Sequence, residues 1–365
     1  MCIFNKPLKL MFLCVFALGL IILMVIFPDK SILAASNAVN AWLTIIIPSL
    51  MPFSLASLIL INSGLIERIF TRSDKIIRSI IGFNGCFVFL FLSSCLSGYP
   101  MGAKLTGTLR KKGSISETEA AFLVNATSTT GPLFLVGSVA LGILKNASFG
   151  AVLLLSHYTA AASVAFINGR IYKKTCSGHE QKRIAPVRKR IGVILSESVS
   201  DSVSSMLAIL AFMVLFFAAA EMLEVTGIFS VFPLKAGAYL KAICSGLLEV
   251  TSGCIFAGSL EHNSAIILIS FFCGFGGASI IAQTISVSGI NRSFVISKLF
   301  QGSLSAILCA VFSGQICRPL HWLPFAATAI FAAITAELRL RKHYHLSFLF
   351  CRRAVFSFNK SKLSL

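Results

Sequence analysis

Long apolar stretches separated by short polar connections fill most of this sequence, and they limit what it can fold into. Hydrophobic residues make up 56% of the 365 residues, charged residues only 12%, and the mean hydropathy is +0.87. A single soluble core could not bury so much apolar surface. Many stretches match the ~20 residues that cross ~30 Å of hydrocarbon as a helix. We therefore predict an all-α polytopic membrane protein in contact with the lipid bilayer.

The order of apolar and basic segments constrains the topology. The apolar segments fall at about 10–27, 41–66, 80–109, 119–144, 147–170, 205–229, 238–260, 264–290, 295–317 and 322–338. If each crossed the membrane once, the basic run 173–190 would lie opposite the N-terminus and the basic residues of 68–78. The positive-inside rule disfavours that arrangement. The first segment is longer than the apolar region of a signal peptide, so we expect it to remain as a helix.

Two segments contain helix-breaking residues and are predicted to be re-entrant hairpins. Segment 80–109 is interrupted by Gly98, Pro100 and Gly102, and segment 238–260 by glycines. If both turn back to the face from which they enter, the basic linker and the C-terminal tail become cytoplasmic, as do most of the 32 Lys and Arg residues. The exceptions are Lys104, within the first hairpin, and Lys30, Lys145, Lys235, Lys241 and Arg318 outside. The hairpins then enter from opposite faces, which gives the inverted repeats that are common in transporters.

This topology divides the chain into six parts. They are an N-terminal transmembrane helix (1–36), a first repeat (37–172), a cytoplasmic linker (173–190), a second, inverted repeat (191–318), a last transmembrane helix (319–338) and a basic cytoplasmic tail (339–365).

Four polar or glycine-rich interruptions are the candidate site: residues 97–104, 125–132, 249–253 and 274–279. In order they belong to a hairpin, a helix, a hairpin and a helix. An interrupted helix frees backbone N–H and C=O groups that cost several kcal/mol each in hydrocarbon, so such backbone survives only inside protein or beside water. We therefore expect the interruptions to meet near the middle of the membrane around one polar cavity.

The interruptions provide groups suited to a small anionic solute. Each half-helix N-terminus favours an anion by about 0.3–1 kcal/mol, and hydroxyl and amide groups add directed hydrogen bonds. The predicted substrate-binding residues are Ser97, Gly98, Tyr99, Pro100, Gly102, Lys104, Asn125, Ser128, Thr129, Thr130, Gly131, Pro132, Glu249, Thr251, Ser252, Gly253, Gly274, Gly276, Gly277 and Ser279.

Lys104 and Glu249 are the charges expected at membrane depth, where an unpaired charge costs at least about 2.5–3.5 kcal/mol. In one interpretation, Lys104 meets a substrate carboxylate and Glu249 binds a coupling cation or proton. In the other, the two side chains pair with each other. No other cofactor is predicted.

Several function classes receive no support from the sequence. The net charge of +19 follows the membrane topology and does not indicate nucleic-acid binding. HExxH, GxSxG and P-loop motifs do not occur, so we predict no enzyme. The cysteines form no CxxC pair, and no histidine cluster completes a metal site. A homo-oligomer is compatible with the sequence.

Three motifs carry a resemblance to a known family. They are SGYPMGAKL (97–105), GPLFLVG (131–137) and GLLEVTSG (246–253), in this order. Together they are similar to the YlbJ family of sporulation integral membrane proteins, over about residues 10–340. That family belongs to membrane proteins with nucleoside-recognition, or Gate, domains, which resemble the core of concentrative nucleoside transporters. The resemblance implies that both repeats are Gate-like.

The resemblance also implies a biological role. It indicates a spore-forming Firmicute, expression in the mother cell, and the mother-cell membrane that surrounds the forespore. It implies transport of dipicolinate, a small dianion, toward the forespore, for spore maturation and heat resistance. A nucleoside is not expected, because among the site residues only Tyr99 offers an aromatic ring for stacking. A non-transporting membrane scaffold for coat or cortex assembly, using the linker and the tail, is the alternative. A membrane-embedded enzyme would need a second carboxylate near Glu249.

Overall fold

The computed structural model describes residues 6–70, 74–176, 190–288 and 292–314. All regular elements in these ranges are helices. The predicted last transmembrane helix (319–338), the tail (339–365) and most of the linker (173–190) lie outside them.

The N-terminal region contains two long apolar helical stretches. Its elements are α1 (Lys6–Ile26), α2 (Pro28–Ala41), η1 (Trp42–Ile46), α3 (Ile47–Asn62), α4 (Leu65–Phe70) and α5 (Asp74–Ile80). Pro28 stands in the first turn of α2, where proline needs no backbone donor. The π-helical turn η1 carries α2 directly into α3, so the second stretch begins at Pro28, earlier than the expected residue 41.

The next elements contain the first two predicted interruptions. They are α6 (Cys86–Ser97), α7 (Met101–Lys111), α8 (Glu117–Thr127), the π-helical η2 (Leu133–Ile143) and α9 (Ser148–Cys176). At 1.5 Å per residue, α6 and α7 are each too short to cross a bilayer. Their lengths agree with a hairpin, whose re-entrant path stays a prediction.

The remaining helices contain the other two interruptions. They are α10 (Ile191–Val225), η3 (Ile228–Val231), α11 (Leu234–Leu248), α12 (Val250–Gly258), α13 (His262–Phe275), α14 (Gly277–Ser288) and α15 (Arg292–Phe312). Glu197 and Asp201 lie on the same continuous helix as the apolar run that follows them.

Five helical stretches of the described residues are long and apolar enough to cross a membrane. They are Pro28–Asn62, Ser148–Thr175, Ile191–Val231, His262–Ser288 and Ser293–Phe312. Outward-facing side chains on them include Leu155 and Leu207, both more than half exposed. Such apolar surface suits contact with lipid. The chain is therefore an all-helical, polytopic membrane protein, whereas the inverted repeats stay a prediction.

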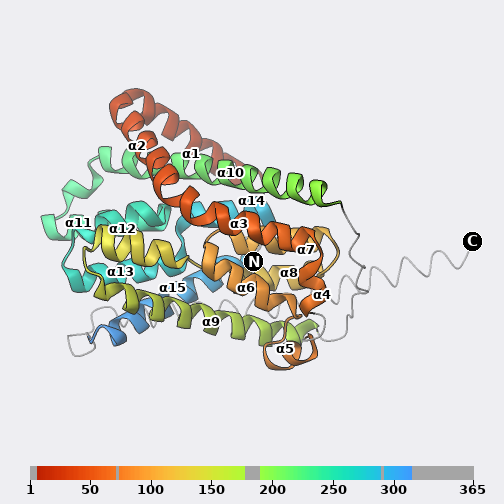
Figure 1. Cartoon of the computed structure of the whole chain (residues 1–365). Helices are drawn as coiled ribbons and strands as arrows, with labels where there is room; N and C mark the ends of the chain where they lie inside the picture. The colour runs from red at the N-terminus through yellow and green to blue at the C-terminus, as the bar shows by residue number, and fades with distance from the viewer. Residues whose placement is uncertain (1–5, 71–73, 177–189, 289–291, 315–365) are drawn as a thin grey trace, which may run out of the picture.

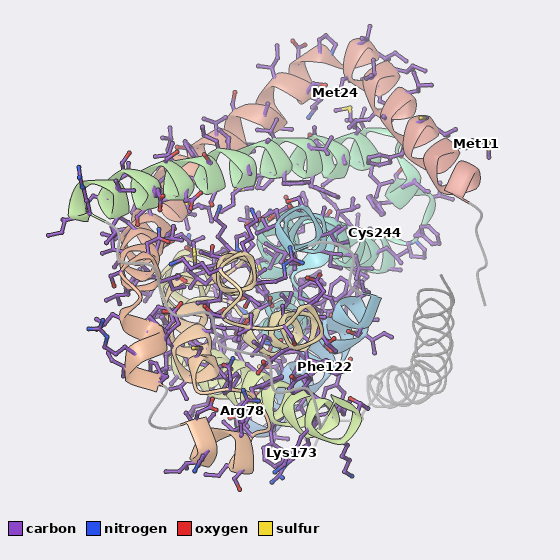
Figure 2. All side chains as sticks on the ribbon, turned by 90° about the vertical axis from the view of Figure 1, so that its right-hand side faces the viewer. Met11, Met24, Arg78, Phe122, Lys173 and Cys244 are labelled. Carbon is purple, nitrogen blue, oxygen red and sulfur yellow. The ribbon has the colours of Figure 1, made fainter. Side chains whose placement is uncertain are left out.

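The two long helices α9 and α10 lie on opposite sides of α6, α7, α8, α12 and α13 (Figure 1). Helices α6, α7 and α8 lie toward one end of this arrangement, and α11, α12 and α13 toward the other (Figure 1). Both views place α1 and α2 on the outer side of α10, away from the short helices (Figures 1 and 2).

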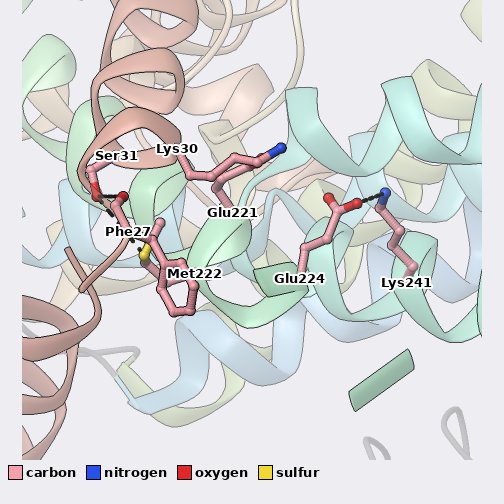
Figure 3. A network of polar contacts seen from close by, with 7 residues as sticks. All are labelled: Phe27, Lys30, Ser31, Glu221, Met222, Glu224 and Lys241. Atoms are coloured by element: carbon pink, nitrogen blue, oxygen red, sulfur yellow. Dashed lines mark hydrogen bonds and ion pairs between the residues drawn. The ribbon is translucent and has the colours of Figure 1, made fainter. Parts of the chain in front are cut away.

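Side-chain contacts fasten α2 and α11 to the end of α10 (Figure 3). Ser31 of α2 donates a hydrogen bond to the Met222 sulfur over 3.9 Å. On α11, the Lys241 ammonium lies 2.5 Å from a Glu224 carboxylate oxygen and 4.0 Å from the centre of the Phe256 ring. The far end of α10 thus contacts both the outer layer and the third interrupted element.

The buried apolar residues form two large clusters. One contains Leu58, Leu90, Leu109 and Leu123 and takes in α3, α6, α7, α8 and part of α10. The other takes in η2 and α11 to α13, and includes Ile269. The helical path α8–η2 therefore passes from the first cluster into the second, and its interruption lies between them.

Candidate functional site

The helices are interrupted at all four predicted places. We call residues 98–100, between α6 and α7, the first break, and residues 128–132, between α8 and η2, the second break. Glu249, between α11 and α12, is the third break, and Gly276, between α13 and α14, is the fourth.

The backbone at the breaks leaves the helical conformation in two ways. Gly98 and Gly276 have φ angles of +82° and +85°, a region that glycine enters without steric cost. Ser128 and Glu249 are extended, with φ/ψ angles of −94°/111° and −146°/127°. Each break therefore ends one helix and allows the next to begin.

The first break packs against the second, and the third against the fourth. A Cβ built on Gly98 would lie 2.9 Å from the Gly131 nitrogen, and one on Gly102 would lie 2.0 Å from the Thr127 oxygen. A Cβ on Gly277 would lie 3.1 Å from the Leu248 oxygen. The glycines are needed because backbone meets backbone at these contacts.

The hydroxyls of two side chains, Thr130 and Tyr99, join the two pairs of breaks through hydrogen bonds. The Thr130 hydroxyl donates to the Cys273 carbonyl over 2.8 Å. The Tyr99 hydroxyl donates to the Gly274 carbonyl over 3.2 Å. Both acceptors are among the last carbonyls of α13, which have no partner in their own helix. The four breaks thus converge, as the sequence predicted.

The second break is surrounded by side chains that satisfy its backbone. The Tyr158 hydroxyl donates to the backbone carbonyl oxygen of Thr130 over 3.1 Å. The His157 Nε2 atom accepts from the Thr130 N–H over 3.1 Å and lies 2.6 Å from the Thr129 hydroxyl. Since unsatisfied backbone is costly in a membrane, these side chains account for the stability of a non-helical segment there.

A buried lysine contacts both breaks of the first half. Lys298 of α15 is fully buried, and its ammonium donates to the Ser128 oxygen over 2.8 Å. The same ammonium donates to the Gln301 Oε1 atom over 2.5 Å and lies 4.6 Å from the centre of the Tyr99 ring.

A cavity of about 60 Å³ lies where the breaks meet. Its walls contain residues of three breaks, together with side chains of α3, α10 and α14. The predicted site residues in these walls are Ser97, Gly98, Tyr99, Thr130, Gly131, Glu249 and Thr251. The helices α7, η2 and α12 begin beside these residues, so their N-terminal ends surround the cavity.

Among the described residues that line the cavity, Glu249 is the one that can carry a charge at neutral pH. It is buried, and its Oε2 atom accepts a hydrogen bond from the Ser252 N–H over 2.8 Å, which caps the start of α12. Gln283 of α14 also lines the cavity, and its buried Oε1 atom has no hydrogen-bond partner among the described residues. A ligand that donates a hydrogen bond could satisfy this oxygen.

Twelve other predicted site residues are not among the residues that line the cavity. They are Pro100, Gly102, Asn125, Ser128, Thr129, Pro132, Ser252, Gly253, Gly274, Gly276, Gly277 and Ser279. Among them, Asn125 donates to Asn168 of α9 and to Ser293. Ser279 accepts from Gln283 over 3.1 Å and so orients a residue of the wall.

Lys104 does not reach the cavity in this structure. Its ammonium lies 3.7 Å from the Asp201 carboxylate of α10, and the Lys104 side chain is 20% exposed. The pairing of Lys104 with Glu249 is therefore not present in this structure, and the contact of Lys104 with a substrate stays a prediction.

Lys298 and His157 were missed as site residues. Lys298 lies within the apolar segment 295–317, where a charge is as costly as at Lys104. The cost of a charge at membrane depth, which identified Lys104 as a candidate, could therefore have identified Lys298 too. His157 gave no such signal, because a lone histidine in an apolar helix does not reveal which backbone it will face.

The comparisons with known proteins agree with the resemblance carried by the motifs. The chain is homologous to the sporulation integral membrane protein YlbJ of Bacillus subtilis (strain 168), with 29% identity over 327 residues, 80% of this chain and 79% of that protein. No family model and no solved structure match it. The chain is therefore an integral membrane protein that is similar to the sporulation protein YlbJ.

Proposed function

We propose that this homologue of YlbJ is a carrier that moves a small anion, dipicolinate, across the mother-cell membrane toward the forespore. The observation that carries the proposal is the convergence of four interrupted helices on one partly polar cavity inside a membrane protein. Non-helical backbone is costly at membrane depth, and in transporters it forms the binding site of a polar solute.

The helix ends favour an anion. The N-terminal ends of α7, η2 and α12 surround the cavity, and each brings the positive end of a helix dipole. The arrangement of α6 and α7 toward one end of the molecule, and of α11 and α12 toward the other, is also expected of hairpins that enter from opposite faces (Figure 1).

Glu249 gives this site a means of coupling. Its carboxylate would repel an anion in the same cavity. A proton on Glu249 removes that repulsion and weakens the hydrogen bond that the side chain accepts from the Ser252 N–H. In this mechanism an anion enters together with a proton, and the two halves then move to open the cavity to the other side.

The test is uptake of labelled dipicolinate into liposomes that contain the purified protein, with and without an inward proton gradient. We expect the gradient to stimulate uptake by the wild type. Glu249→Gln keeps the size and a cap oxygen but cannot cycle a proton, so its uptake should no longer respond to the gradient.

Glu261→Gln is the matched control, because Glu261 is 68% exposed in its pair with Lys235 and lies outside the cavity walls. It should respond to the gradient as the wild type does. Wild-type uptake no greater than that of empty liposomes would contradict the carrier proposal.

The scaffold proposal makes the opposite prediction. If the linker 173–190 and the tail 339–365 recruit coat or cortex enzymes, replacing these segments should abolish spore heat resistance. Cavity variants such as Glu249→Gln should then produce normal spores with a normal dipicolinate content.

A further inference from the structure

The ammonium of Lys298 lies in surroundings that resemble the binding site of a cation. Its two hydrogen-bond acceptors are the Ser128 carbonyl and the Gln301 Oε1 atom, and the face of the Tyr99 ring lies 4.6 Å away. Carbonyl and amide oxygens are the usual ligands of hard cations, and an aromatic face attracts an ammonium.

The position of these acceptors adds to the attraction. Ser128 directly follows α8, so its carbonyl lies at the negative end of that helix's dipole. Within the described residues, Lys298 forms no ion pair. The charge is thus compensated by carbonyl oxygens, a helix C-terminus and a ring, as a bound metal cation would be.

Gln301 supports this interpretation. Its side chain is 1% exposed and turns its Oε1 atom to the Lys298 ammonium, while its Nε2 atom is buried without a partner. Leaving a buried amide group unpaired is destabilising. The Gln301 side chain therefore keeps its oxygen on the Lys298 ammonium although this orientation leaves its Nε2 atom without a partner.

We propose that Lys298 is a resident, covalently attached cation that fixes the first and second breaks to each other and occupies the place of a coupling metal ion. Lys298 belongs to α15, in the second half of the chain, and it contacts Ser128, which belongs to a break in the first half. The stabilising role is independent of transport. The consequence that transport needs no Na⁺ rests on the proposed function.

The test is to remove the tethered ammonium and supply a free one. Lys298→Ala removes three methylene groups and the ammonium, which together correspond to propylammonium. In purified protein without substrate, we expect the Ala variant to melt roughly 5 °C or more below the wild type. Propylammonium should raise its melting temperature in a saturable way and leave the wild type unchanged.

Two controls separate charge from packing. Lys298→Met fills most of the volume without a charge, so it should melt below the wild type and should not respond to propylammonium. N,N,N-Trimethylpropylammonium carries the charge without N–H donors and should not rescue the Ala variant. If the Ala variant can be purified only when propylammonium is present during extraction, that result would equally support the proposal.

The proposal is overturned if Lys298→Met is as stable as the wild type, or if propylammonium neither stabilises the Ala variant nor improves its recovery. These measurements involve no transport, so they stand even where dipicolinate uptake fails. Where uptake is observed, replacing Na⁺ by choline should leave the wild-type rate unchanged, and a requirement for Na⁺ would refute the role of Lys298 as a substitute for a metal ion.

Discussion

At the scale of single residues, Gly102 is a position where the backbone of another helix leaves no room for a side chain. A Cβ there would lie 2.0 Å from the Thr127 oxygen, which is backbone and cannot move alone. Gly102→Ala should therefore destabilise the protein by about 1–3 kcal/mol. Gly137→Ala is the control, because nothing lies within 4 Å of a Cβ at Gly137. Thermal unfolding in detergent compares them, and equal melting temperatures would contradict the close packing of α7 on the second break.

The residue scale also separates what could be predicted from what could not. Gly98 and Pro100 are interruptions whatever surrounds them, because their effect on a helix is local. The contacts of Lys298 and His157 depend on which helices meet, since each satisfies backbone far away in the sequence. Local chemistry therefore predicted the breaks, whereas their partners required the three-dimensional packing.

At the scale of elements, α12 depends on the cap that Glu249 provides. The carboxylate accepts from the Ser252 N–H, one of the first donors of the helix. Glu249→Ala removes this acceptor and should lower the free energy of unfolding by about 0.5–2 kcal/mol. Glu249→Gln retains an oxygen and should lose less. Chemical denaturation in mixed micelles measures both, and an Ala variant as stable as Gln would exclude the capping role.

Element boundaries were predicted least well. The apolar pattern placed the second segment at residue 41, but the structure continues the helix from Pro28 through η1 into α3. The residues 28–41 are less apolar, and α2 packs on α10 in the outer layer. Hydropathy marks where a helix is apolar and does not mark where it begins.

At the scale of the whole molecule, the two apolar clusters are joined at the breaks by hydrogen bonds. Thr130→Val removes the donor to the Cys273 carbonyl and keeps the shape of the side chain. We expect faster amide hydrogen exchange around residues 272–277, because this contact fixes the end of α13. Thr44→Val is the control, since the Thr44 hydroxyl donates within its own helical turn, to the Asn40 carbonyl. Unchanged exchange in the Thr130 variant would show that the contact does not couple the clusters.

The size of the cavity limits which form of the protein the structure represents. One water molecule needs roughly 10–15 Å³ of cavity volume measured in this way. The cavity of about 60 Å³ therefore admits a few waters and no aromatic dicarboxylate. The walls must therefore separate before a solute of that size can enter. Opening the walls costs free energy, which weakens binding. The measured dissociation constant equals the dissociation constant of the open form divided by the fraction of protein that is open. A variant that favours the open form should consequently bind more tightly without any new contact to the solute.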